Sequence, residues 1–190
     1  MSTISYVTSS GTSATSTTVT LDLGALDSSQ LKSIPTANIA ALTTATVTEI
    51  PEDAISGLTS LQINALPTEV IEKITTAQLG ALSTAQVSYL KTTQLTLLTS
   101  SQIKSFSPEQ LGAMKLAYLS TAQVAAITPD QISNASAVVV SSLSPDQFEA
   151  FNSQQISALT VPQINALTAS QIAKLDTAEL QSLNDEQWRH

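Results

Sequence analysis

Few residues in this 190-residue chain could do acid–base or metal chemistry. There is one histidine, His190, and no cysteine, so the sequence offers no Cys nucleophile, no thiolate metal ligand and no internal His for a Ser-His-Asp arrangement. Two pairs of adjacent acids, Glu52–Asp53 and Asp185–Glu186, could act as a carboxylate pair or bind a cation. We favour the interpretation that they are solvated partners of helix N-termini. We therefore expect no catalytic, cofactor-binding or metal site, and no enzymatic activity.

Glutamine is the polar residue with the most regular spacing. Residues 159–182 read LTVPQINA, LTASQIAK and LDTAELQS, which is one eight-residue pattern written three times. In this octad an aliphatic residue stands first and Ser, Thr, Asp, Asn or Pro second. Gln usually stands fifth, another aliphatic residue sixth, and a small residue often closes the octad. Such a column of amides could contact a polymer, a glycan or another subunit, or it could serve the backbone locally.

The spacing of the glutamines favours the local role. Ser107 and Gln110, like Thr128 and Gln131, form the S/T-x-x-Q pattern of a capping box, in which two side chains bond to the free N–H groups of a helix start. Proline at the third position, as in Pro129, fits the first residue of a helix, where no N–H is needed. Each octad is therefore predicted to begin its own helix of about one and a half turns.

The octads run through almost the whole chain and must be positioned by a repeat architecture. One continuous helix is excluded, because eight residues at about 100° each would rotate equivalent positions by roughly 80° per octad. A β-coil is disfavoured by the five-then-three spacing of apolar residues and by the helix-forming Gln, Ala, Leu and Lys. The first residues of the octads share an apolar side chain and are Leu26, Ile34, Leu42, Ile50, Leu58, Leu66, Ile74, Leu82, Leu90, Leu98, Phe106, Met114, Leu119, Ile127, Ala135, Leu143, Phe151, Leu159, Leu167, Leu175 and Leu183.

The expected fold is an all-α solenoid of short capped helices over residues 26–190, with positions one and six turned inward. Pro35, Pro51 and Pro67 recur sixteen residues apart, which favours two octads per coil, about ten coils, and a rod roughly 80–100 Å long. A register slip at residues 115–118 predicts one helix that starts after Ser107 and runs an extra turn to Tyr118.

Residues 1–25 form a separate Ser/Thr-rich arm. The alternation from Val19 through Leu21 to Leu23 predicts a short extended segment. This arm is either a flexible leader or a piece that covers the end of the solenoid or pairs with a neighbouring molecule. Phe106, Phe148, Phe151 and Trp188 fall on core positions, and Trp188 could also cover an open end. The candidate self-association residues are Tyr6, Val19, Leu21, Leu23 and Trp188.

Charge and hydropathy exclude several classes of partner. The net charge is −8 with scattered Lys and Arg, so nucleic-acid binding is not expected. No apolar run approaches the roughly 18 residues of a membrane span, so membrane insertion is not expected. The N-terminus lacks the basic start and apolar stretch of a cleavable signal peptide, so export would use another route.

Octads such as LSTAQVAA, LTSSQIKS and LTVPQINA resemble the LTxxQIxAL octapeptide arrays of large bacterial surface and secreted proteins of the adhesin-like or hemagglutinin-like kind. The resemblance covers residues 26–190 and implies a bacterial, extracellular or cell-surface, non-enzymatic protein. We expect a structural role, as a surface spacer, adhesin stalk or self-assembling fibre subunit, with a second copy or other surface proteins and glycans as partners. The alternative is a solenoid scaffold that binds a protein, peptide or glycan.

Overall fold

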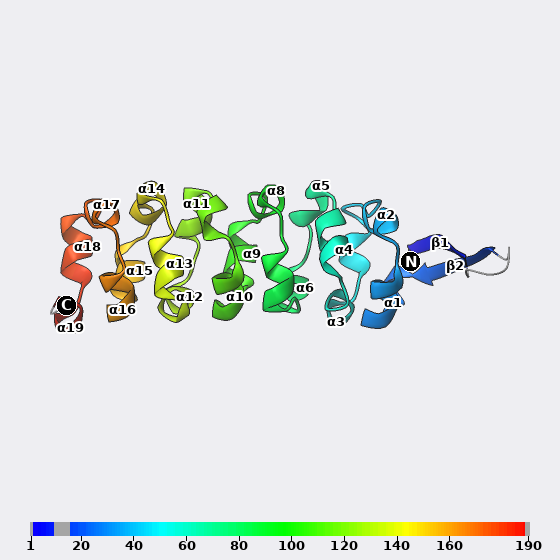
Figure 1. Cartoon of the computed structure of the whole chain (residues 1–190), viewed down its shortest axis with the longest axis horizontal. Helices are drawn as coiled ribbons and strands as arrows, with labels where there is room; N and C mark the ends of the chain where they lie inside the picture. The colour runs from blue at the N-terminus through cyan, green and yellow to red at the C-terminus, as the bar shows by residue number, and fades with distance from the viewer. Residues whose placement is uncertain (1, 10–15, 189–190) are drawn as a thin grey trace. The chain divides into compact units, whose positions relative to one another are not determined.

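The structure is a computed structural model that describes residues 2–9 and 16–188. It divides into two compact units, residues 2–97 and residues 98–188, which are described separately. Both consist of short helices that follow one another in chain order (Figure 1). The expected all-α solenoid of short capped helices with an extended N-terminal arm is confirmed.

Unit 1 begins with a hairpin and continues with one short helix per octad. Its elements are β1 (Thr3–Ser9), β2 (Ser16–Asp22), η1 (Leu23–Ala25), α1 (Ser28–Ser33), α2 (Thr36–Ile39), η2 (Val47–Glu49), α3 (Glu52–Ile55), α4 (Ser60–Ala65), α5 (Thr68–Ile71), α6 (Thr76–Gly80), α7 (Thr84–Ser88) and α8 (Thr92–Leu95).

Unit 2 continues the same pattern. Its elements are α9 (Ser100–Ser105), α10 (Pro108–Ala113), η3 (Leu116–Tyr118), α11 (Thr121–Ala125), α12 (Pro129–Asn134), α13 (Ala137–Ser141), α14 (Pro145–Glu149), α15 (Ser153–Ser157), α16 (Val161–Asn165), α17 (Ala169–Ile172), α18 (Thr177–Ser182) and α19 (Asp185–Trp188).

Three octads make one coil in both units. In unit 1 helix α1 packs against α3 and α2 packs against α4; in unit 2 the helices α11, α12 and α13 pack against α14, α15 and α16 in turn. The prediction of two octads per coil is therefore wrong. The predicted rod length is no longer supported, because it was calculated from ten such coils. The sixteen-residue spacing of the prolines marks octads with a different cap, whereas the packing period is 24 residues. The coils are residues 26–49, 50–73 and 74–97 in unit 1, and 98–118, 119–142, 143–166 and 167–188 in unit 2.

The first and sixth positions of the octads form the core, as expected. Leu31 and Ile39 are completely buried, and Phe106, Phe148 and Phe151 are buried as predicted. The rings of Phe148 and Phe151 stack at a tilt with their centroids 5.3 Å apart. Burying such side chains supplies most of the free energy of folding, because helices this short are unstable in isolation.

Trp188 departs from this rule. It stands at a sixth position, but 57% of its surface is exposed, so the prediction that it is a core residue is wrong. The reason is that no described coil packs on the side of α19 where the next coil of a solenoid would lie.

The register slip is a short octad and not a long helix. Helix α10 ends at Ala113 because Met114 adopts an extended conformation with φ −82° and ψ 147°. The separate turn η3 follows, and its Leu116 is buried as the sixth-position residue would be. The prediction of one helix running to Tyr118 is therefore wrong. Three residues of the cap region are missing, and the coil of residues 98–118 is shortened accordingly.

The N-terminal arm is a β-hairpin that covers the first coil of unit 1. Its strands pair antiparallel with Tyr6 opposite Val19 and Ile4 opposite Leu21. Tyr6 is buried and its hydroxyl lies 3.1 Å from the Ser33 hydroxyl on α1. The described residues of the arm therefore support the alternative in which it covers the end of the solenoid over the alternative of a flexible leader. The expected strand around Val19 is present, and the partner strand β1 was not predicted.

Candidate functional site

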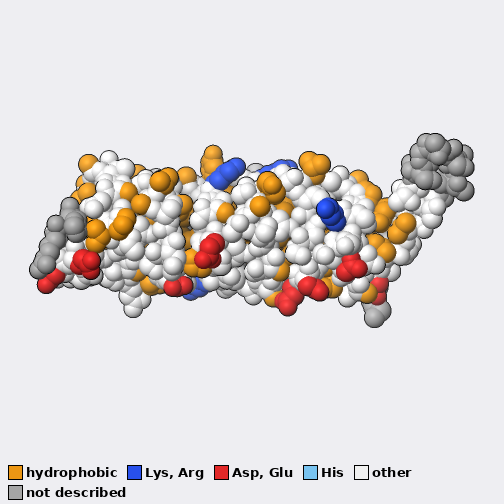
Figure 2. Space-filling model, turned by 60° about the horizontal axis from the view of Figure 1, so that its bottom comes forward, with side chains coloured by type: hydrophobic (Ala, Val, Ile, Leu, Met, Phe, Trp, Pro, Cys, Tyr) orange, Lys and Arg blue, Asp and Glu red, His pale blue; other side chains and the backbone are white. Residues whose placement is uncertain are grey.

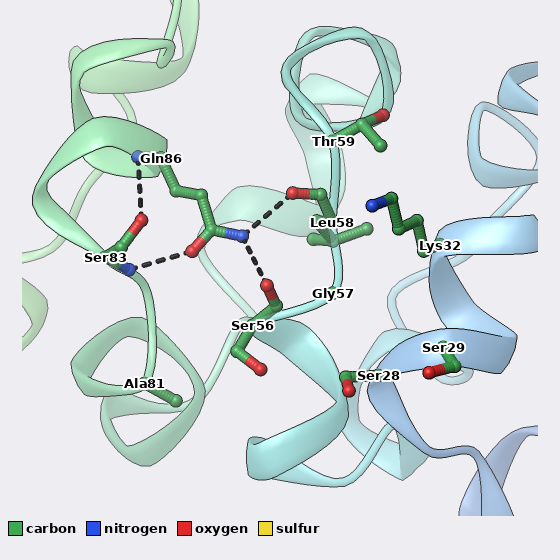
Figure 3. A pocket seen from close by; sticks show the side chains of 10 residues that line it. All are labelled: Ser28, Ser29, Lys32, Ser56, Gly57, Leu58, Thr59, Ala81, Ser83 and Gln86. Atoms are coloured by element: carbon green, nitrogen blue, oxygen red, sulfur yellow. Dashed lines mark hydrogen bonds between the residues drawn. The ribbon is translucent and has the colours of Figure 1, made fainter.

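Most glutamines at the fifth position make two kinds of hydrogen bond. Gln86 is an example: its side-chain oxygen accepts the backbone N–H of Ser83 at 2.8 Å, which is the predicted capping box. Its side-chain amide donates to the carbonyl oxygens of Ser56 at 2.9 Å and Leu58 at 2.8 Å (Figure 3). The first bond fixes the start of its own helix, and the other two join that helix to the coil before it.

This arrangement recurs in both units. The amide usually donates to the backbone carbonyl oxygens of the sixth residue of one octad and the first residue of the next. Gln94, for example, donates to the carbonyl oxygens of Ile63 at 2.9 Å and Leu66 at 3.1 Å. We call these side chains the glutamine ladder. Its members with described amide bonds to the preceding coil are Gln62, Gln78, Gln86, Gln94, Gln123, Gln131, Gln147, Gln155, Gln163, Gln171 and Gln187.

The glutamine ladder is internal. Its members are buried, with Gln171 completely so and Gln86 the least, at 7% exposed. An amide that is buried and bonded at both ends is not available to a polymer or glycan, so the interpretation of the column as an exposed contact surface is wrong. The capping interpretation is confirmed, and the bonds between coils are an additional role that was not predicted.

Proline at the second position excludes glutamine at the fifth. Pro35, Pro51 and Pro67 begin α2, α3 and α5 without a side-chain cap bond. Proline has no N–H for a glutamine oxygen to accept, so a capping box cannot close there. Asn38, Ala54 and Val70 occupy the corresponding fifth positions.

One fifth position is occupied by a glutamate, Glu179, whose side chain cannot donate a hydrogen bond when it is ionised. Glu179 is 9% exposed, and its carboxylate accepts the backbone N–H of Asp176 at 3.0 Å. It therefore completes the capping box of α18. A carboxylate has no N–H to donate to the preceding coil, so α18 lacks the second kind of bond.

The adjacent acids lie at exposed helix starts. Glu52 and Asp53 are in the first turn of α3, and Asp185 and Glu186 are in the first turn of α19. That placement agrees with their interpretation as partners of helix N-termini. Among the described residues, no three His, Cys, Asp or Glu side chains gather in a way that could hold a metal ion.

Among the described residues, charged side chains connect separate elements at two places. Lys174 lies 2.6 Å from Glu149 and 3.1 Å from Asp146, and these carboxylates raise the pKa of the lysine, Glu149 more than Asp146. The carboxylate of Glu49 accepts the hydroxyl of Ser2 at 2.7 Å and its backbone N–H at 2.9 Å. These bonds lower the pKa of Glu49 and fasten the start of β1 to the first coil.

A shallow hollow of about 610 Å³ lies on unit 1 beside the ladder (Figure 3). Half of its ten lining residues carry a hydroxyl group, and Lys32 is the one cation among them. Gly57 lines the hollow, and an added Cβ there would lie 2.0 Å from the carbonyl oxygen of Ser28. Glycine is therefore required there by the close approach of α3 and α1.

The predicted self-association residues fall into two groups. Tyr6 and Leu23 are buried against the first coil of their own chain, and Val19 and Leu21 are half-buried on the same hairpin. Trp188 is exposed at the other end of the sequence. The structure thus leaves Trp188 as the member of this set with the most accessible side chain.

The visible surface is mostly uncharged. Figure 2 shows Lys, Asp and Glu side chains scattered among polar and apolar ones, with no large field of one sign. None of the described helices combines the length and the apolar character needed to cross a bilayer.

Residues 71–108 match the ALTTAQ repeat family. The matched segment contains ALSTAQ at residues 81–86, which runs into the capping box of α7. No curated protein was found to match the chain. The match and the recurring short helices together show a repeat protein with a helical solenoid fold.

Proposed function

We propose that this chain is a non-catalytic structural protein of a bacterial surface, where its stacked coils form a stiff spacer or adhesin stalk or the subunit of an extracellular fibre. The observation that carries the proposal is the glutamine ladder. Hydrophobic contacts are non-directional and allow coils to slide, whereas most ladder amides fix one coil to the next at two carbonyl oxygens. Stiffness is the property that this arrangement provides.

The use of the polar side chains supports the same role. The regularly spaced glutamine amides are buried and hydrogen-bonded within the chain. The described acids lie at helix ends or in ion pairs. Location outside the cell is part of the proposal and rests on the resemblance of the octads to those of surface and secreted proteins. Protease treatment of intact cells tests it, because a surface protein is degraded while a cytosolic marker survives.

Small-angle X-ray scattering and light scattering over a hundredfold concentration range test the mechanical proposal. A stiff spacer gives one maximum dimension and no flexible component in the scattering at every concentration. A fibre subunit gives filaments in electron micrographs of the concentrated fractions. Scattering from a flexible chain of independent parts would overturn the proposal.

A binding scaffold is the second candidate, favoured by the hollow beside Lys32. A hydroxyl-lined surface with one cation suits an acidic glycan more than an apolar ligand. Titration with a panel of acidic and neutral oligosaccharides tests this candidate. Saturable binding that is lost in Lys32→Ala supports it, and the absence of binding at millimolar concentrations rejects it.

A further inference from the structure

No other described element covers the apolar positions at the C-terminal end of unit 2. We call the set formed by Ile164, at the end of the coil of residues 143–166, and by Leu167, Ile172, Leu175, Leu180, Leu183 and Trp188 of the last coil the C-terminal face. In the coil of residues 143–166 the corresponding Phe148, Phe151, Ile156 and Leu159 are at most 4% exposed. On the C-terminal face Ile172 is 51% and Trp188 57% exposed, and the others are half-buried. These side chains line an apolar hollow of about 350 Å³.

The same face presents carbonyl oxygens without ladder partners. In the preceding coils the carbonyls of Val140 and Leu143 accept the amide of Gln171, and that of Leu159 accepts the amide of Gln187 at 2.6 Å. The next equivalent carbonyls belong to Ile164, Leu167, Ile172 and Leu175. No glutamine amide of the described residues donates to them. They have the same three-residue spacing as the occupied pairs.

The first coil of unit 1 shows how this chain covers such a surface with its own residues. The Asn38 side chain, at a fifth position, donates to the carbonyl of Ser5 on β1 at 3.0 Å. The hairpin therefore takes the place of a preceding coil in both bonding and packing, and it buries Ile4 and Tyr6. No comparable element covers the C-terminal face among the described residues.

We infer that the C-terminal face docks a further ladder coil of three octads, with glutamine at the fifth positions, that is not part of residues 1–190. The face continues an interface that this chain already forms between successive coils. An occupant must fill an apolar surface and also supply N–H donors to carbonyl pairs spaced three residues apart. A ladder coil does both, whereas an apolar small molecule supplies no donors. This inference rests on the proposed structural role and names a partner for it.

The single tryptophan makes the inference testable in the whole protein. The probe is a synthetic peptide of residues 143–166, which carries Gln147, Gln155 and Gln163 and contains no tryptophan. Covering Trp188 shifts its emission to shorter wavelength, so titration of the peptide into the full chain is expected to give a saturable blue shift. The matched control peptide replaces the three glutamines with Glu, which keeps the cap acceptor and removes the donor. We expect it to bind at least about tenfold more weakly.

A free peptide must order itself on binding, so a covalent version keeps the inference falsifiable. The same 24 residues are appended after His190 in octad register, with the Glu-substituted version as its control. We expect the glutamine version to raise the unfolding midpoint and to bury Trp188, and the Glu version to do so less. If the glutamine extension leaves both the midpoint and the emission unchanged, the inference fails, even where scattering shows a stiff array.

Two variants separate the C-terminal face from general hydrophobicity. Ile172→Glu places a charge on the face at an exposed position and is expected to abolish the emission shift. Val138→Glu alters a side chain that is 75% exposed elsewhere in unit 2 and is expected to leave the shift intact. A shift that arises on concentrating the protein without any peptide would instead identify a second copy as the occupant and overturn the inference as stated.

Discussion

The carboxylate of Glu179 holds the backbone N–H of Asp176 in the same way that the ladder glutamines hold their cap residues. By the register of the neighbouring octads, the carbonyls that a glutamine at this position would bond are those of Phe148 and Phe151. A carboxylate has no N–H to donate to them. The contact between α15 and α18 is therefore made without the amide bonds that join other coils.

Glu179→Gln is expected to stabilise unit 2. The amide retains the bond to Asp176 and gains donors for the Phe148 and Phe151 carbonyls, which is worth about 1–2 kcal/mol in the free energy of unfolding. Urea denaturation followed by circular dichroism measures it. A neutral or destabilising result would show that Glu179 is held by contacts other than the cap.

Gln171→Glu is the reverse change on a completely buried residue. It keeps the cap bond to Thr168 but removes the donors to Val140 and Leu143, and it buries a charge. We expect a loss of roughly 2–4 kcal/mol in the free energy of unfolding. Gln154→Glu, on an exposed neighbour of the ladder, is the matched control and should change stability by less than about 0.5 kcal/mol. Equal effects of the two changes would contradict the role of the ladder.

Gly57→Ala should destabilise unit 1 by about 1–3 kcal/mol, because the new Cβ would collide with the backbone of Ser28. Gly112→Ala is the paired test. Its Cβ would meet nothing within 4 Å inside α10, so the gain in helix propensity should stabilise unit 2 by about 0.5–1 kcal/mol. Thermal unfolding of both variants checks the difference in sign.

The hairpin should loosen in acid through Glu49. Its pKa is lowered from 4.5 because its carboxylate accepts two bonds from Ser2. A lowered pKa means that the contribution to docking is present above the ordinary glutamate range and is lost as the pH falls through the lowered value. The backbone amide signal of Ser2 in NMR spectra should therefore shift and exchange faster at the acid end of the titration. Glu49→Gln should remove this pH dependence, and an unchanged profile in that variant would assign the effect to another group.

The sequence predicted the parts of the fold that depend on local chemistry. Capping boxes such as Ser107–Gln110 and inward residues such as Leu31 and Phe148 follow from side-chain type and spacing alone. The number of octads per coil could not be predicted from the sequence. The spacing of the prolines reflects the type of helix cap, whereas the coil period depends on packing between residues about 24 positions apart. The end of α10 at Ala113 was missed for a similar reason, since the burial of Leu116 decides where the chain turns.

A signal for the role of the ladder was present in the sequence. A capping box needs only an acceptor at the fifth position, so Glu would serve as well as Gln. The described capping boxes use Gln, with Glu179 as the exception, and that preference indicates a requirement for a donor. The exposure of Trp188 could not be predicted from its octad, because burial at a sixth position depends on a neighbour three octads away.

The bonding distance of the ladder has a consequence for how such a gene can change in length. Each glutamine bonds to octads that lie a fixed number of residues back, so duplication or loss of one whole coil of 24 residues restores every bond. Gain or loss of a single octad would instead move each later helix to a different side of the coil and pair glutamines with the wrong carbonyls. The short coil of residues 98–118 is a third case. The amide of Gln131 still donates to the carbonyl oxygens of Ile103 and Phe106, although these residues lie 28 and 25 positions back and not 31 and 28 as for Gln94. Recombination in this gene should therefore be tolerated in steps of three octads, or as small deletions within the cap region of one octad.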